Sequence, residues 1–147
     1  MDPAIRGLQP DTRVVDELTK AEILFGEISS PLKANCKLKT AVDFVRIGRF
    51  LKDSIDDIIT KLKPSDISRI KLLGVHILGY EVRWYLFYIK YDGLYIFYEM
   101  AKTNLPAAIN EISVLQQGLD IMNTSRVHIM YHFFILDLFI FTCFFID

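Results

Sequence analysis

KLKTAVDFVRIGRFLKDSIDDIITK, residues Lys37–Lys61, is the clearest helical pattern in the chain. Apolar residues recur at helical spacing along one side of this segment, and charged residues spaced four apart, such as Lys52 and Asp56, lie on the opposite side. Each such charge pair adds roughly 0.2–0.5 kcal/mol to the stability of a helix. Pro64 ends the pattern, because proline cannot continue a helix. The pattern predicts a long amphipathic helix. Its expected apolar stripe is Leu38, Val42, Val45, Leu51, Ile55, Ile58, Ile59 and Leu62.

Strand-like runs flank this helix on both sides. Asp92-Gly93 separates two of them and is the two-residue signal of a tight hairpin. The element order β-β-α-β-β-β-α predicts an α/β (α+β) domain, with a mixed, largely antiparallel sheet packed against the long helix and a second helix. The expected strands are Thr12–Val15, Ala21–Ile28, Lys71–Leu78, Glu81–Tyr91 and Leu94–Met100, and the expected second helix is Ala107–Ile121.

Length and composition favour one domain. The 147 residues are 52% hydrophobic and 24% charged, which is typical of a globular chain. We expect an irregular segment at residues 1–9, a domain at 10–122 and an apolar tail at 127–147. The net charge of −1 indicates no particular partner. The two cysteines have no zinc-finger spacing, and the N-terminus lacks an apolar signal core, so we expect an intracellular protein without a disulfide framework.

The tail contains an 18-residue apolar stretch, residues 129–146, interrupted by His132 and Asp137. Its length suits a membrane span, but the cost of inserting Asp137 offsets most of the favourable contribution of the apolar residues. Three interpretations stay open: a C-terminal membrane anchor, a buried element of the domain, or a non-native end. No feature of the sequence indicates the oligomeric state.

Two carboxylates are candidates for chemistry. Asp11 precedes the first strand-like run, and Glu27 ends the second. If these runs pair antiparallel, the two carboxylates come close together and could hold Mg²⁺, which takes one or two protein carboxylates together with substrate phosphate. The simpler interpretations are a turn residue for Asp11 and an ion pair with Lys33 or Lys37 for Glu27.

These residues resemble a known motif. Pro10-Asp11 followed by Glu27-Ile28-Ser29 resembles the PD-(D/E)xK motif of the restriction-endonuclease-like nucleases. Phe25-Gly26-Glu27, Lys52-Asp53-Ser54-Ile55-Asp56 and Tyr91-Asp92-Gly93-Leu94-Tyr95 are similar to segments of uncharacterised fungal proteins associated with that fold. The resemblance implies a metal-dependent nuclease domain, with Asp11 and Glu27 holding Mg²⁺ and nucleic acid as substrate.

The chain departs from this motif at Ser29, which stands where the family has its lysine. A serine hydroxyl cannot supply the positive charge of that lysine. Lys33 is the candidate for a relocated lysine, and Lys37 and Lys39 are alternatives to it. We therefore expect a degenerate nuclease-like domain, with a non-enzymatic binding or regulatory domain, or a membrane-anchored version, as alternatives. His76 lies in an apolar run, which favours a hydrogen-bonded core histidine over a ligand.

Overall fold

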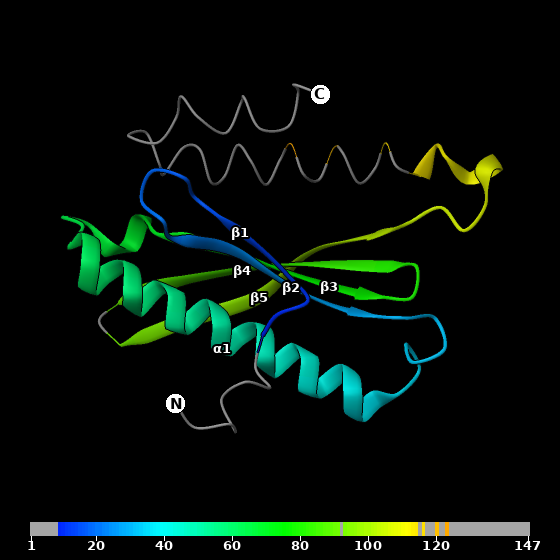
Figure 1. Ribbon diagram of the computed structural model, residues 1–147, viewed down its shortest axis with the longest axis horizontal. Helices are drawn as coiled ribbons and strands as arrows, with labels where there is room; N and C mark the ends of the chain where they lie inside the picture. Colours follow the sequence, from blue (N-terminus) through cyan, green and yellow to red (C-terminus); the bar gives the residue numbers. More distant parts are fainter. Residues whose placement is uncertain (1–8, 92, 115, 117–119, 121–122, 124–147) are drawn as a thin grey trace.

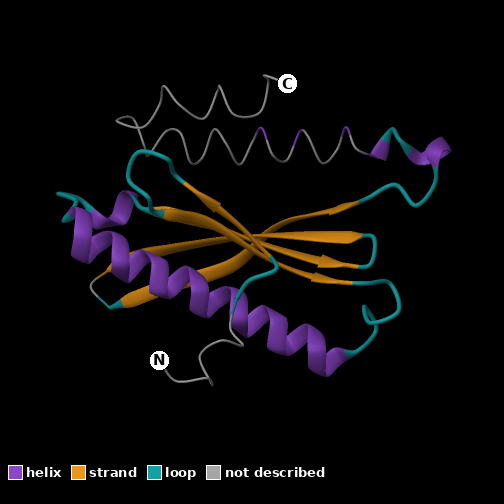
Figure 2. Cartoon of the chain, in the orientation of Figure 1, coloured by secondary structure: helices purple, strands orange, loops and turns teal. Residues whose placement is uncertain are grey.

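The computed structural model describes residues 9–91, 93–114, 116, 120 and 123. A five-stranded sheet in the order β1-β2-β3-β4-β5 lies against one long helix, α1 (Figures 1 and 2). Neighbouring strands are antiparallel except β2 and β3, which are parallel and are joined through α1. The mixed sheet and the order β-β-α-β-β-β confirm the predicted fold class. The elements are β1 (Thr12–Val15), β2 (Glu22–Ser29), α1 (Lys37–Leu62), β3 (Lys71–Leu78), β4 (Glu81–Tyr91) and β5 (Leu94–Asn104), with short 3-10 helices η2 (Ile67–Arg69) and η3 (Ile109–Glu111).

Several predicted segments fall partly or wholly outside the described residues. Within the range expected for the second helix, the structure shows η3, and part of the remainder is not described. The tail at 127–147 and residues 1–8 also lie outside. No helix in the described part of the chain has the length and apolar character needed to cross a bilayer.

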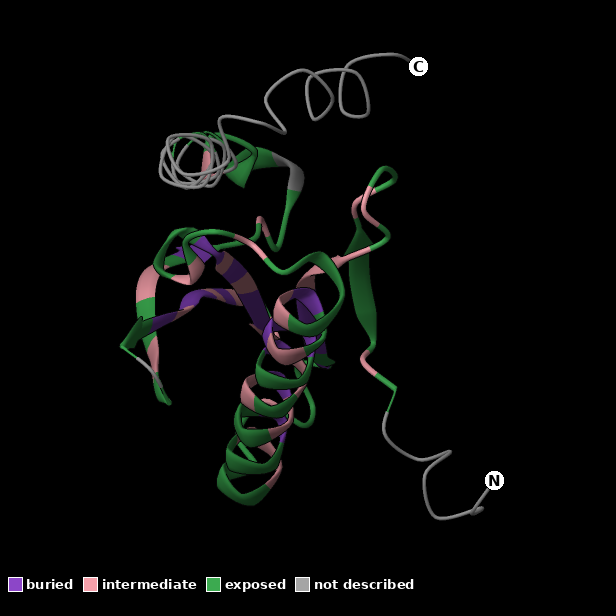
Figure 3. Cartoon of the chain, turned by 90° about the vertical axis from the view of Figure 1, so that its left-hand side faces the viewer, coloured by how far each residue is buried: buried purple, intermediate pink, exposed green. Residues whose placement is uncertain are grey.

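The main core lies between α1 and the sheet. Ile47, Leu51 and Ile55 of α1 are fully buried against Phe25 of β2 and Leu72 of β3. In Figure 3 the buried segments lie mainly in the strands beside the helix. Of the predicted apolar stripe, Leu51, Ile55 and Ile58 are buried and Ile59 is partly buried. Leu38, Val42, Val45 and Leu62 are exposed, and Ile47 takes the buried position that precedes Leu51.

Gly74 of β3 lies where the sheet packs tightly against α1. A Cβ atom there would lie 2.7 Å from Ile47 Cγ2 and 3.2 Å from Leu51 Cδ1. We expect Gly74→Ala to destabilise the domain by about 1–3 kcal/mol, because both neighbours are packed core side chains. Gly48→Ala is the matched control. Its Cβ would make an ordinary 3.4 Å contact with Phe97, so the gain in helix propensity should stabilise the domain by up to about 1 kcal/mol.

Urea denaturation of the two variants and the parent checks this prediction. If Gly74→Ala matched or exceeded the parent in its free energy of unfolding, the close packing of β3 against α1 would be wrong.

Candidate carboxylate site

Asp11 and Glu27 are brought together by the pairing of β1 with β2. The register places Thr12 opposite Gly26, so one further residue places Asp11 opposite Glu27. The Oδ2 atom of Asp11 accepts a hydrogen bond of 2.7 Å from the backbone N–H of Ile28. This bond fixes the Asp11 carboxylate beside the end of β2.

Glu27 is 1% exposed, and its side chain points toward α1. Burial raises its pKa to about 7; the negative charges of Asp11 and Asp43 add to the rise, and Arg46 opposes it. Arg46 Nη1 lies 3.2 Å from Glu27 Oε2, but in the described part of the chain neither carboxylate oxygen of Glu27 makes a hydrogen bond. Arg46 is itself tethered, because Nη2 donates to the carbonyl of Gln9 at 2.8 Å.

Asp43 is the centre of a second group of contacts behind Glu27. Its Oδ2 accepts from Ser29 Oγ at 3.0 Å and from Lys39 Nζ at 2.5 Å, and Arg46 Nη1 lies 3.9 Å from its Oδ1. Burial alone would raise the pKa of Asp43, but the hydrogen bonds from Lys39 and Ser29 outweigh it, so the pKa is lowered. Asp43 is therefore a buried, ionised carboxylate.

His76 of β3 also lies beside Asp43, and we call Glu27, Ser29, Lys39, Asp43, Arg46 and His76 the buried cluster. It is fully buried and pairs in register with Glu27 on the neighbouring strand. Burial lowers its pKa against the opposing effect of Asp43, so the imidazole is neutral near pH 7. Its Nε2 lies 3.8 Å from Asp43 Oδ2, and neither ring nitrogen has a hydrogen bond in the described structure. It lies in the core as expected, but without the expected hydrogen bond.

The candidate lysines are placed differently from one another. Lys33, the first choice from the sequence, is exposed in the turn before α1, and no described ion pair or hydrogen bond joins its side chain to Asp11 or Glu27. Lys37 is also exposed. Lys39 is the lysine that reaches the buried cluster, where its ammonium group and the Ser29 hydroxyl share one carboxylate oxygen of Asp43.

Three members of the cluster were not assigned a site role from the sequence: Asp43, Arg46 and His76. Lys39–Asp43 has the same spacing as the surface pair Lys52–Asp56, and for that reason the sequence places Asp43 on the solvent-exposed face. The structure corrects this, because Asp43 is 1% exposed. The signal in the sequence that could have indicated a buried role for Asp43 is that it is a single acid in a segment otherwise rich in Lys and Arg.

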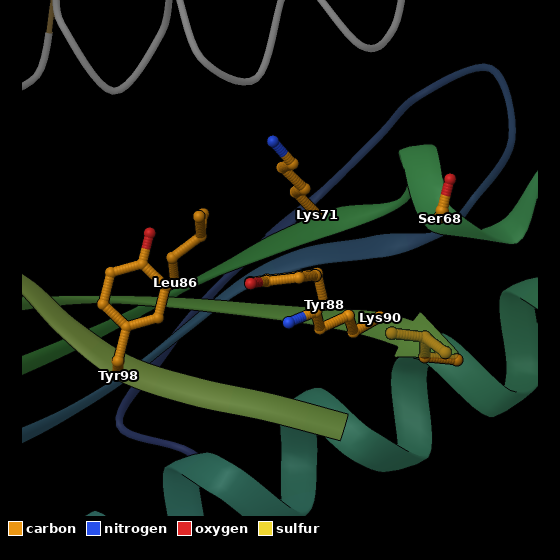
Figure 4. Close-up of a pocket in the computed structure, with 7 residues that line it drawn as sticks. Ser68, Lys71, Leu86, Tyr88, Lys90 and Tyr98 are labelled. Carbon is orange, nitrogen blue, oxygen red and sulfur yellow. The ribbon is translucent and has the colours of Figure 1, made fainter. Parts of the chain in front are cut away.

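A groove of about 850 Å³ begins beside this cluster and runs between β1–β2 and α1. Arg46, Arg13 and Arg49 line it, and Phe25 and Phe50 stack with ring centroids 5.6 Å apart. A smaller pocket of about 270 Å³ lies at the end of the β4–β5 hairpin (Figure 4). It is lined by Lys71, Tyr88 and Tyr98 among others and has no carboxylate, so it is separate from the candidate site.

The described residues offer a limited set of metal ligands. No group of three or more His, Cys, Asp or Glu side chains among them could hold a metal ion. Asp11 and Glu27 supply two hard oxygen ligands, and the buried Glu27 oxygens lack hydrogen bonds. This donor set fits Mg²⁺ only with further ligands from water or a bound phosphate.

Comparison of the chain with protein-family models, with curated proteins and with solved structures finds no match.

Proposed function

We propose that this is a PD-(D/E)xK nuclease-like domain that no longer hydrolyses phosphodiesters and acts as a binding or regulatory module. The observation that supports this is the set of cations around the carboxylates. The cation nearest Glu27 is the guanidinium of Arg46, and Ser29, in the position of the motif lysine, donates its hydroxyl to Asp43.

Hydrolysis at such a site requires an activated water and a positive charge beside the reacting phosphate. Arg46 cannot accept a proton, because a guanidinium stays protonated in proteins. It also lies 3.2 Å from Glu27 Oε2, so a divalent cation has to compete with it. Lys39 has its ammonium group 2.5 Å from a carboxylate oxygen of Asp43. Its charge is therefore already balanced within the fold.

The alternative is a metal-dependent nuclease, and one observation favours it. The proximity of Asp11 to Glu27 helps to raise the Glu27 pKa, and a bound divalent cation would relieve that repulsion. In this alternative Asp11 and Glu27 would hold Mg²⁺, which supplies Lewis-acid stabilisation and an activated water when bound. Lys39, rather than Lys33, would be the lysine nearest to Ser29.

One set of measurements separates the two functions. We expect the full chain to give no cleavage of single- or double-stranded DNA or RNA above background with Mg²⁺ or Mn²⁺. Calorimetric titration with either ion should give the same heat for the parent and Glu27→Gln. Glu22→Gln is the matched control, because Glu22 lies on the same strand in an exposed ion pair with Arg13.

Metal-dependent cleavage that disappears in Glu27→Gln and persists in Glu22→Gln would establish the nuclease instead. Metal binding with the same dependence on Glu27, but without cleavage, would leave the non-catalytic module and add Mg²⁺ as its ligand.

A further inference from the structure

The outer face of the first half of α1 is an exposed aliphatic surface. Leu38, Val42 and Val45 are 76%, 48% and 58% exposed, and their spacing of four and three residues places them in one line along the helix. Leu32, in the turn just before the helix, is 97% exposed. These four residues are called the aliphatic patch. Exposed aliphatic side chains gathered in this way indicate an interaction surface.

The charge around the aliphatic patch is positive. Residues 30–52 contain six Lys and Arg and one Asp. Three of the six cations are paired with acids: Lys39 with Asp43, Arg46 with Glu27 and Lys52 with Asp56. The single acid, Asp43, is buried and paired with Lys39. Lys33, Lys37 and Arg49 are exposed, and the described residues provide no ion-pair partner for them. The surface therefore combines apolar side chains with three exposed cations that have no ion-pair partner among the described residues.

The second half of α1 is different. Its outer face has paired charges, with Lys52 2.5 Å from Asp56 and Lys61 2.7 Å from Asp57. An ordinary solvated helix face has this mixed character. The aliphatic patch is thus a local feature of the first three turns and not a general property of the helix.

The position of the patch leaves it open to a partner. Among the described elements, α1 packs against β2, β3 and β4, and Phe44 also stacks on Phe97 of β5. The buried residues Ile47, Leu51 and Ile55 make the core contacts, and they lie on the side of α1 away from Leu38, Val42 and Val45. Figures 1 and 2 show α1 as the outer layer on that side of the sheet. A second copy of this chain is a poor occupant, because antiparallel pairing of the same faces would bring Lys37 of one copy near Arg49 of the other.

We propose that the aliphatic patch binds the surface of an anionic lipid membrane. Aliphatic side chains on a convex, basic helix enter the headgroup region, and the flanking cations contact the lipid phosphates. Each Lys or Arg near such a surface strengthens partitioning roughly five-fold. This membrane contact is independent of the proposed function of the carboxylate site and of the apolar stretch at 129–146.

Cys36 provides a local reporter, because it is an exposed thiol at the start of α1, two residues before Leu38. In the full chain, Cys143→Ser leaves Cys36 as the single cysteine, to be labelled with an environment-sensitive fluorophore. Vesicles of phosphatidylcholine alone are compared with vesicles that also contain phosphatidylserine. We expect a blue shift of the label with phosphatidylserine vesicles only, weakened by salt.

The triple substitution Leu38→Ser, Val42→Ser, Val45→Ser should reduce this partitioning at least ten-fold. Leu62→Ser is the matched control, because Leu62 is an exposed aliphatic residue of α1 outside the patch, and it should leave partitioning unchanged. Equal shifts with neutral vesicles, vesicle binding without a shift at Cys36, a shift that depends on protein concentration without vesicles, or no binding would each overturn the proposal.

Discussion

Asp43→Ala is expected to destabilise the domain by roughly 3–5 kcal/mol, which is the usual cost of removing one partner from a buried charge cluster. Asp43 accepts hydrogen bonds from Ser29 and Lys39 and lies near Arg46 and His76. Without it, the Ser29 hydroxyl loses its acceptor and the Lys39 ammonium loses its counter-charge. Asp43→Asn should cost less, because the amide oxygen can still accept from Ser29.

Asp57→Ala is the control for this prediction. Asp57 also pairs with a lysine four residues away on α1, but its side chain is 51% exposed. Such a surface pair contributes about 0–1 kcal/mol. Urea denaturation followed by circular dichroism measures all three variants. If Asp43→Ala lowered the free energy of unfolding no more than Asp57→Ala does, the contacts of Asp43 would not contribute to the stability of the fold.

The positions of the strands and of the long helix could be predicted from the sequence, because they depend on local patterns. Strand and helix positions follow from local periodicity, and the Asp92-Gly93 turn identifies the β4–β5 hairpin directly. Helix α1 therefore ends at Leu62, within one residue of the expected Lys61. The fold class depends mostly on such local signals.

Burial on α1 could not be predicted in the same way. A periodicity argument ranks residues by apolarity alone, and it selected Leu38, Val42 and Val45 over Asp43 for the core. In the structure the first turns of α1 face Ser29 and His76, which are polar, so the side that is buried there is the polar one. Which side of a helix is buried depends on the residues that it packs against, and the sequence of the helix alone does not specify them.

In the candidate site, too, some residues could be predicted from local sequence and others depend on tertiary contacts. Asp11 and Glu27 could be proposed because they lie in a short motif and on neighbouring strands. Arg46 and His76 come from α1 and β3, and their proximity to Glu27 exists only after the β2-α1-β3 crossover has formed. Lys33 was favoured by its position shortly after the motif, but the turn at 31–35 leaves its side chain in solvent.

Glu27→Gln is expected to become more stable than the parent as pH rises. The pKa of Glu27 is about 7 in the folded state against an ordinary value of 4.5, so between these values the folded chain holds a proton that the unfolded chain releases. The parent therefore loses folding free energy as pH rises through this window, by roughly 3 kcal/mol in total. Glutamine cannot titrate, so the variant lacks this loss.

The measurement is the free energy of unfolding in urea for the parent and Glu27→Gln at several pH values from 4 to 8. Their difference should be near zero at pH 4 and reach roughly 3 kcal/mol in favour of the variant at pH 8. The difference cancels the opposite contribution of His76, whose lowered pKa removes stability as pH falls. A flat difference for Glu27→Gln would contradict a raised pKa.

The same titration bears on the function. A nuclease site would hold Mg²⁺ between Asp11 and Glu27, so added Mg²⁺ would stabilise the parent at pH 8 and leave Glu27→Gln unchanged. A site closed by Arg46 has no such dependence, because the guanidinium already occupies the position beside Glu27. We expect the second result, in which ionised Glu27 stays a cost to the fold at pH 8 whether or not the ion is present.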